Sequence, residues 1–289
     1  MKQKLSRNLI LLLSIPFFNA CSPAVMSEEK DFNAYLPPSF EVSDAEINYI
    51  EGSSAEEQNI AQPDVWDVSD VDVSYIDPNR KLIALTFDDA PSKTLERILA
   101  VFASFNEQSP DCKATATIFI NGKLIDNNAL PHLYTANALG IELGNHTHSH
   151  FDLTTLSEEE LQQEIDNTDR LLARVDNKPR HLLRAPFGKI DERVKTISPV
   201  PLIDWTIDTL DWTGKTPDEI FDSIFLSRFS GAIALMHDGY ENTVEALKRL
   251  LPALKEAGYQ AVSVSALAKA HGCVLKRGKV YIRARKQQK

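Results

Sequence analysis

The sequence predicts an α/β protein: a distorted or incomplete (β/α)7-type barrel with parallel strands, preceded by an acidic and mostly irregular N-terminal segment. From residue 80 onward, short apolar or β-branched runs alternate with segments of helical periodicity. Seven such units in about 210 residues average about 30 residues each, which is the size of a βα repeat. Residues suited to catalysis or metal binding follow six consecutive strands, as expected at the mouth of a barrel.

Strands are predicted wherever an apolar run of four to seven residues ends in turn-forming or polar residues. These runs are 82–87, 114–120, 140–144, 181–184, 202–207, 232–236 and 260–264. Helices are predicted at 92–107, 123–138, 157–176, 190–197, 217–229, 242–257 and 265–270. Ser157 and Glu160 form a capping box at the third helix, and Pro217 follows Thr216 in the first turn of the fifth.

The positions of the polar residues favour a barrel over an open, doubly wound sheet. In a barrel, catalytic residues collect at the carboxyl ends of many strands, whereas an open sheet concentrates them at one switch point. The polar residues that follow the first six strands are Asp88 and Asp89, Asn121, His146 and His150, Arg184, Asp208 and Asp211, and His237 and Asp238. A random distribution would have placed several of them at strand starts or within helices.

The composition is that of a soluble globular protein, with 43% apolar and 25% charged residues in a chain of 289. The net charge of −10 argues against a general nucleic-acid binder, which needs a basic face. The acidity is local, because residues 22–79 carry fourteen acids and one base, whereas 80–289 carry 27 of each. We therefore predict an acidic tether at 21–79, whose end packs on the domain, and a globular domain at 80–275.

A basic tail is predicted at 276–289, where seven bases occur without an acid. Such a tail could contact an anionic polymer or phospholipid. A solvated end, or pairing with the acidic tether, is the interpretation we favour.

The N-terminus has the pattern of an export signal. Lys2, Lys4 and Arg7 form a positive region before an apolar run at 9–18. This run has the length of a signal-peptide core and is too short to span a bilayer as a stable helix. We predict that residues 1–20 are removed on export, with a buried N-terminal helix as the alternative.

Cys21 resembles the lipidated cysteine of a bacterial lipobox, because the small residue Ala20 precedes it. We expect a lipoprotein that is anchored to a membrane facing the periplasm through a lipid on Cys21. Ser22 favours the outer membrane, and plain secretion is the alternative. Cys112 and Cys273 would then form one disulfide or remain two buried thiols.

The spacing of three histidines predicts a metal site. In a helical turn, His146 and His150 lie at i and i+4 on one face and can bind one ion. Two imidazoles and a carboxylate from Asp88 or Asp89 would leave an open position on Zn²⁺ for water, as in catalytic zinc sites. The alternative is a solvated loop, and we expect His148 to be a bystander or a neighbour of the ligands.

The remaining strand-end residues fit proton transfer. Of two neighbouring aspartates, one can bind the metal while the other acts as a general base. His237, across the mouth, is the expected general acid. Arg184 and Asp208 fit orienting roles toward a carboxylate and an imidazolium, with an ordinary salt bridge as the alternative. The other histidines, His132, His181 and His271, are expected at the surface or in packing roles.

Five short segments carry these residues. They are TFDDA at 86–90, HTHSH at 146–150, RAPFG at 184–188, DTLDW at 208–212 and LMH at 235–237. In this order they resemble the five motifs of the NodB-homology polysaccharide deacetylases, carbohydrate esterase family four. The resemblance covers about residues 80–270 and implies a distorted (β/α) barrel. Ala90 departs from the family pattern, which usually has glycine after the aspartate pair.

The resemblance implies a divalent metal bound by Asp89, His146 and His150. Zn²⁺ is the usual ion, and another divalent cation such as Co²⁺ is the alternative. By the same resemblance, Asp88 is the catalytic base and Arg184 orients it.

The resemblance also assigns the acid and the substrate pocket. His237 would be the catalytic acid and Asp208 would tune it. Trp212 and Leu235 would line an apolar pocket for the acetyl methyl group. The backbone N–H of Phe187 would help to stabilise the oxyanion.

The expected activity is metal-dependent hydrolysis of N- or O-acetyl groups on a cell-envelope or extracellular polysaccharide. The partner is an acetylated glycan, and we expect a monomeric catalytic domain. One alternative is an amidase of the same superfamily that acts on a small non-sugar acylamide. Another is an inactive glycan-binding lipoprotein, which would lack a motif residue, whereas none is missing here.

Overall fold

The computed structural model describes residues 64–285, so the expected signal segment and Cys21 lie outside the described residues. The strands are β1 (Lys81–Ala90), β2 (Thr117–Ile120), β3 (Glu142–Asn145), β4 (Leu202–Ile203), β5 (Ile207–Asp208), β6 (Ala232–His237), β7 (Tyr259–Val262) and β8 (Val280–Tyr281). The helices are α2 (Leu95–Gln108), α3 (Leu130–Ala138), α4 (Glu158–Asp176), α5 (Glu192–Ile197), α6 (Pro217–Ser227), α7 (Glu241–Glu256) and α8 (Val264–His271). Within this range, none of the helices has both the length and the apolar character needed to cross a bilayer.

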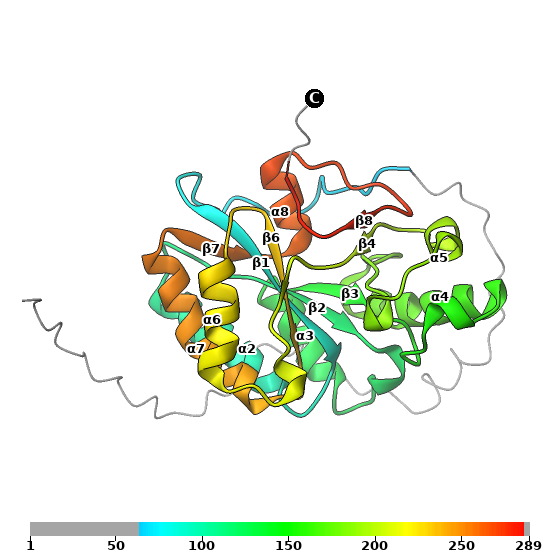
Figure 1. Ribbon diagram of the computed structural model, residues 1–289, viewed down its shortest axis with the longest axis horizontal. Helices are drawn as coiled ribbons and strands as arrows, with labels where there is room; N and C mark the ends of the chain where they lie inside the picture. The colour runs from blue at the N-terminus through cyan, green and yellow to red at the C-terminus, as the bar shows by residue number, and fades with distance from the viewer. Residues whose placement is uncertain (1–63, 286–289) are drawn as a thin grey trace, which may run out of the picture. The chain divides into compact units, whose positions relative to one another are not determined.

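β1 is the central strand of a parallel sheet with the order β3-β2-β1-β6-β5 (Figure 1). β7 also pairs with β1, along the first four residues of that strand. Side chains alternate along a strand, so β1 contributes to two interiors. Its odd positions, from Ile83 to Phe87, pack in the cluster that includes α2, α3 and α7. Its even positions face the other side. Leu82 and Ala84 pack in the cluster that includes α8, and Thr86 and Asp88 are the next even positions along the strand.

The strands continue beyond β3 as a ring that is only partly regular. Leu183 forms single parallel bridges to Asn145 at the end of β3 and to Leu202 in β4. β4 pairs with β8, and Arg283 then forms an antiparallel bridge to Ala232 at the start of β6. The α/β fold with parallel strands and a distorted barrel is therefore confirmed.

Two predicted strands differ from the structure. The run 181–184 contributes only the bridge at Leu183 rather than a strand. The run 202–207 is divided into β4 and β5, because the backbone changes partners within it. The amide of Asp204 donates to the carbonyl of Tyr281, whereas the amide of Thr206 donates to Ile233 in β6.

One predicted helix is also divided. The run 123–138 contains a 3₁₀ turn at Gly122–Leu124 and then α3, which begins only at Leu130. Between them, the carboxylate of Asp126 accepts hydrogen bonds from the amides of Asn128 and Ala129. This local side-chain acceptor replaces helical hydrogen bonds and ends the first turn.

The segments on either side of the predicted domain pack on it. Val65 bridges Lys276, the amide of Trp66 donates to the carbonyl of Leu275, and Trp66 packs against the cluster that contains α8. The end of the predicted tether thus packs on the domain, and it pairs with it through one isolated bridge. Part of the predicted basic tail is β8, which pairs with β4. Cys112 and Cys273 are free and buried, so of the two predicted alternatives the structure has the two buried thiols.

His181 lies in the interior rather than at the surface, between two carboxylates of α4. Its Nδ1 is 2.9 Å from Asp169 and its Nε2 is 3.1 Å from Asp176. Burial disfavours the charged imidazole, but the hydrogen bonds and charges of both aspartates outweigh burial and raise the pKa of His181 to about 9. His181 is therefore cationic at neutral pH, and the ion pairs hold α4 against the segment that follows it.

This raised pKa predicts a stability change at alkaline pH. A histidine in an unfolded chain has a pKa of about 6.5, so the stabilisation by charged His181 is fully present below that pH. It is lost as the pH rises through about 9. We expect the free energy of unfolding to fall by up to about 3 kcal/mol over this interval, measured by urea denaturation. The control H181Q has no titrating side chain there, and an equal fall in H181Q would contradict the assignment.

Candidate functional site

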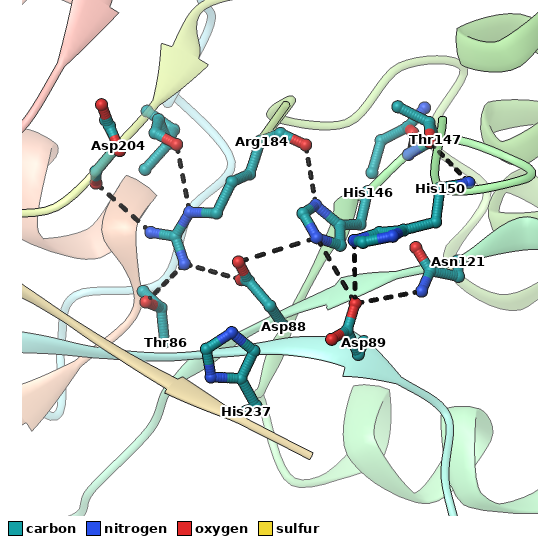
Figure 2. A network of polar contacts seen from close by, with 12 residues as sticks. Thr86, Asp88, Asp89, Asn121, His146, Thr147, His150, Arg184, Asp204 and His237 are labelled. Carbon is teal, nitrogen blue, oxygen red and sulfur yellow. Dashed lines mark hydrogen bonds and ion pairs between the residues drawn. The ribbon is translucent and has the colours of Figure 1, made fainter. Parts of the chain in front are cut away.

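The carboxyl ends of β1, β2, β3 and β6 bring the predicted site residues together (Figure 2). Asp88 and Asp89 end β1, Asn121 follows β2, and His146 follows β3. β1 and β6 are in register, and Asp88 is the direct neighbour of His237. Because these strands pair in parallel, residues from separate sequence segments lie together at one edge of the sheet.

Asp89, His146 and His150 form a group that could hold a metal ion. Their ligand atoms all lie within 4.8 Å of one another. Oδ1 of Asp89 is 3.2 Å from Nε2 of His150 and 3.6 Å from Nε2 of His146. Ligands bound at about 2.0–2.2 Å to a tetrahedral ion are separated by about 3.3–3.5 Å. The donor set and its spacing therefore fit a divalent ion, and the cluster uses the predicted residues.

The imidazole of His146 is oriented for coordination. Its Nδ1 lies 2.8 Å from the carbonyl oxygen of Arg184, which can only accept a hydrogen bond. Nδ1 therefore carries a proton and donates it to this carbonyl, and Nε2 faces Asp89. At His150, burial disfavours the charged ring, and a second positive charge beside His146 would be repelled, so the pKa is lowered and the ring is neutral at pH 7. His150 is thus in the protonation state that binds metals, and Nε2 of His146 is directed toward the same group.

Asn121 is an additional residue at this group. Its side-chain amide donates to Oδ1 of Asp89 over 3.2 Å, as Figure 2 shows. Asn121 is buried, and its own amide donates to the carbonyl of Ala90. It therefore fixes both the carboxylate and the backbone that follows. The sequence placed Asn121 at a strand end without a role, and the type of residue alone does not reveal this contact.

The loops around the site contain an unusual concentration of left-handed backbone. Of the six non-glycine residues with positive φ within 64–285, all but Asn177 lie at the end of β1 or in the loops around the site. The five are Asp89, Thr147, His150, Phe187 and Leu210. Such conformations cost about 1 kcal/mol or more each and persist where surrounding contacts impose them. His150 reaches Asp89 from such a turn rather than from the regular helical turn that the i, i+4 spacing suggested.

Asp88 occupies a separate environment from Asp89. Its Oδ1 accepts a hydrogen bond from Nη1 of Arg184 over 2.7 Å, and its Oδ2 is 3.7 Å from Nε2 of His146. Arg184 is 1% exposed, and the same Nη1 donates to Oγ1 of Thr86. The guanidinium also lies 4.2 Å from the ring centre of Phe119. Arg184 therefore orients Asp88, as predicted, within a fully enclosed ion pair.

The carboxylate that binds His237 is Asp211, and the expectation that Asp208 has this position is wrong. Nδ1 of His237 is 2.7 Å from Oδ1 of Asp211, whose Oδ2 accepts from the His237 amide and from Thr243. Asp208 is exposed, and its side chain accepts from the Leu210 amide. The reason is strand geometry, because Ile207 takes the inward position of β5 and Asp208 the outward one.

Asp211 changes the acidity of His237. Burial lowers the pKa of His237, but the hydrogen bond and the charge of Asp211 outweigh burial, and the pKa lies above its ordinary value. The hydrogen bond occupies Nδ1 and leaves Nε2 for another partner. His237 can therefore hold a proton at neutral pH and donate it from Nε2.

The three predicted pocket residues lie in different surroundings. Phe187 is 62% exposed, and its ring centre is 4.7 Å from that of His150. Trp212 is also more than half exposed and follows Asp211 directly. Leu235 is buried in β6, two residues before His237. Their roles in holding an acetyl group stay predictions.

The remaining histidines lie outside the ligand group. His148 is partly buried beside Thr168 and Gly122, as expected for a neighbour of the ligands. His271 is in α8, where its Nδ1 contacts the carbonyl of Ala284. His132 is in α3.

Asp211 is among the predicted strand-end residues, but the sequence alone did not assign it to His237. The signal that could have identified it is its position directly before Trp212 in the fourth segment.

The chain is similar to known deacetylases in sequence and in fold. The sequence model described as polysaccharide deacetylase matches residues 75–199. Peptidoglycan-N-acetylmuramic acid deacetylase PdaC of Bacillus subtilis (strain 168) is 31% identical over 193 residues, which are 66% of this chain and 40% of that protein. A peptidoglycan-N-acetylglucosamine deacetylase of Bacillus cereus (strain ATCC 14579) is 34% identical over 199 residues, which are 65% of this chain and 89% of that protein.

A solved structure described as T48 deacetylase with substrate has the same fold, with a TM-score of 0.64 and 31% sequence identity. The match covers 71% of this chain and 99% of that one. The chain thus spans less than half of PdaC but most of the Bacillus cereus protein.

The contact of Asp211 with His237 predicts the effect of two matched substitutions. In D211N the charge is lost while burial remains, so we expect the pKa of His237 to fall below its ordinary value of about 6.5. In D208N we expect no change, since Asp208 points to solvent. NMR titration of the His237 imidazole measures both. A fall in D208N, or none in D211N, would restore the assignment to Asp208.

Proposed function

The chain belongs to the polysaccharide deacetylase family, and on that premise we propose that it is a metal-dependent hydrolase of acetylated polysaccharide. It removes N- or O-acetyl groups from a cell-envelope or extracellular polysaccharide. The observation that carries this proposal is the convergence of three groups at one edge of the sheet. These are the Asp89–His146–His150 cluster, the Asp88–Arg184 pair and the Asp211–His237 pair.

Asp88 is the proposed general base. Arg184 holds one carboxylate oxygen of Asp88 and leaves the other on the side of His146, toward the candidate metal group. A water molecule beside these residues loses its proton to Asp88 as it attacks the acetyl carbonyl. Because Arg184 is enclosed, the carboxylate does not need to reorganise during the reaction.

Asp89, His146 and His150 are the residues that would hold the ion. A divalent ion bound there supplies a Lewis acid that polarises the carbonyl and lowers the pKa of water. Zn²⁺ is the ion we propose, with Co²⁺ as the alternative, because nitrogen ligands and one carboxylate suit both.

His237 is the proposed general acid. Its Nε2 protonates the departing amine or hydroxyl, and Asp211 stabilises the imidazolium that exists before this transfer. The N–H of Phe187 would donate to the oxyanion, while Trp212 and Leu235 would contact the acetyl methyl group. This division of tasks between two sides of the site follows from the separate partners of Asp88 and His237.

Substitution of Asp88 tests the base. We expect D88N to reduce acetate release from an N-acetylglucosamine oligomer by about 10²-fold or more while metal binding is retained. D208N is the matched control, because it makes the same change on an exposed residue near the site. Wild-type rates in D88N would contradict the role of Asp88.

Chelation tests the metal. We expect activity to be lost after treatment with a strong chelator and to return on addition of Zn²⁺ or Co²⁺. Full activity in metal-free protein, verified by elemental analysis, would contradict metal dependence.

Exposed aromatic residues around the site support a glycan, rather than a small acylamide, as the substrate. Phe151, Phe187, Trp212 and Tyr240 are exposed on loops that follow the strands of the site. Tyr240 lies beside His237, with ring centres 6.2 Å apart. Aromatic rings with an exposed face are suited to the apolar face of a sugar ring. The relatives named as peptidoglycan deacetylases support a cell-wall glycan in particular.

The aromatic surface predicts a dependence on chain length. We expect Y240A to raise KM for a chitin oligomer by about threefold to tenfold, and to raise KM for N-acetylglucosamine less. L226A removes an exposed side chain on α6 and is the control. Acetate release from small acylamides at higher kcat/KM than from oligomers would favour the amidase alternative.

Export and anchoring are part of the proposal. The pattern of Lys2, Lys4 and Arg7, the apolar run at 9–18 and the cysteine at position 21 supports a lipoprotein on a membrane facing the periplasm. The outer membrane is favoured, and secretion is the alternative. Labelling with a radioactive fatty acid, lost in C21A, tests the anchor. A monomeric catalytic domain is proposed as well, and its test is the mass in solution.

A further inference from the structure

A buried carboxylate on α4, Asp169, contacts both segments that contribute to the site. Asp169 is 2% exposed and lies in the middle of this helix. Its Oδ1 accepts a hydrogen bond from Nδ2 of Asn145 over 2.9 Å and lies 2.9 Å from Nδ1 of His181. Arg180 pairs with the other oxygen, at 3.3 Å. None of these four residues is a candidate metal ligand.

Asn145 connects Asp169 to the histidine loop. It is the last residue of β3 and is fully buried. Its Oδ1 accepts a hydrogen bond from the amide of Thr147 over 2.8 Å, and Thr147 has a φ of 68°. Its Nδ2 also donates to the carbonyl of Ile165 in α4. Asn145 therefore holds the turn between His146 and His150 in its left-handed conformation.

His181 connects Asp169 to the segment of Arg184. The amide of Asn145 donates to the carbonyl of Leu182, and the amide of Arg184 donates to the carbonyl of Asn145. The carbonyl of Arg184 in turn contacts Nδ1 of His146. The spacing between the two segments therefore sets the direction in which Nε2 of His146 points. Asp169 binds one side chain from each segment, 24 and 12 residues away along the chain.

Asp176 offers a natural comparison with Asp169. It also lies on α4, its side chain is 3% exposed, and it contacts the same imidazole, at Nε2 of His181. Asp176 also pairs with the ammonium group of Lys178 and accepts a hydrogen bond from the Lys178 amide, away from the histidine loop. The two aspartates thus share the ion pair with His181, and Asp169 alone joins it to Asn145.

We propose that Asp169 is a positioning residue for the metal site, and that it sets the register between the histidine loop and the Arg184 segment by binding Asn145 and His181 together. The inference rests on the metal role proposed above for Asp89, His146 and His150. A carboxylate remote from the ion can act in this way, because partners that orient ligands contribute strongly to metal affinity.

The test is a titration of the metal-free full chain with Co²⁺, followed by its visible absorption, which reports on the coordination geometry. We expect D169A to weaken Co²⁺ binding by about tenfold and to change the spectrum of the bound ion. D176A is the matched control and should bind Co²⁺ within about twofold of wild type. D169N, which keeps an acceptor oxygen in the same place, should recover part of the affinity.

The Co²⁺ titration distinguishes a failure of the positioning role of Asp169 from a failure of the proposed metal site. Wild-type affinity in D169A, or equal losses in D169A and D176A, would overturn the positioning role while the metal site stands. A wild-type chain that binds no Co²⁺ would overturn the proposed metal site, and the inference with it.

A second variant covers a failure of D169A to fold, as judged by circular dichroism. N145A cuts the same connection from the loop side and leaves the pair of Asp169 and His181 intact. It should lose Co²⁺ affinity by about tenfold, and retention of wild-type affinity would overturn the proposal. If neither variant folds, the contacts of Asp169 with Asn145 and His181 are required for folding, and the positioning role is refuted.

Discussion

The buried guanidinium of Arg184 is the interaction on which the site depends. It pairs with Asp88 and donates to Thr86 and to the carbonyl of Ile203, while its own carbonyl orients His146. A buried charge without these contacts would be strongly unfavourable, so the enclosed state requires β1, β4 and the histidine loop to assemble together. The burial of Arg184 therefore fixes both the position of the Asp88 carboxylate and the orientation of the His146 imidazole.

Environment, rather than residue type, separates the tasks of neighbouring carboxylates. Asp88 and Asp89 are adjacent, yet the left-handed backbone at Asp89 turns its side chain to the imidazoles while Asp88 stays with Arg184. Asp208 and Asp211 show the same separation on β5 and the turn after it, where only Asp211 faces His237. In each pair, a change of backbone direction over one to three residues decides which carboxylate enters the site.

Local signals in the sequence were reliable where the competing tertiary contacts were weak. The capping box predicted at Ser157 is present, Pro217 lies in the first turn after Thr216 as predicted, and α4 and α6 begin where these signals place them. The central strands were equally clear, because residues 82–87 are apolar or β-branched and are covered on both faces. The strand expected at 181–184 failed for the opposite reason. His181 and Arg184 form side-chain ion pairs within a segment that has only single backbone bridges.

The sequence by itself determined the α/β class, the starts of α4 and α6 and the set of residues that end the strands, since these depend on local periodicity and on residue chemistry. It also determined the ligand types, because two histidines and an aspartate at strand ends already favour a divalent ion. Only the tertiary structure decided that Asp211 rather than Asp208 binds His237, that Asn121 binds Asp89, and that His181 is an enclosed cation. These outcomes depend on which way a side chain points after a turn and on what packs against it from distant segments, and neither is encoded in the spacing along the chain.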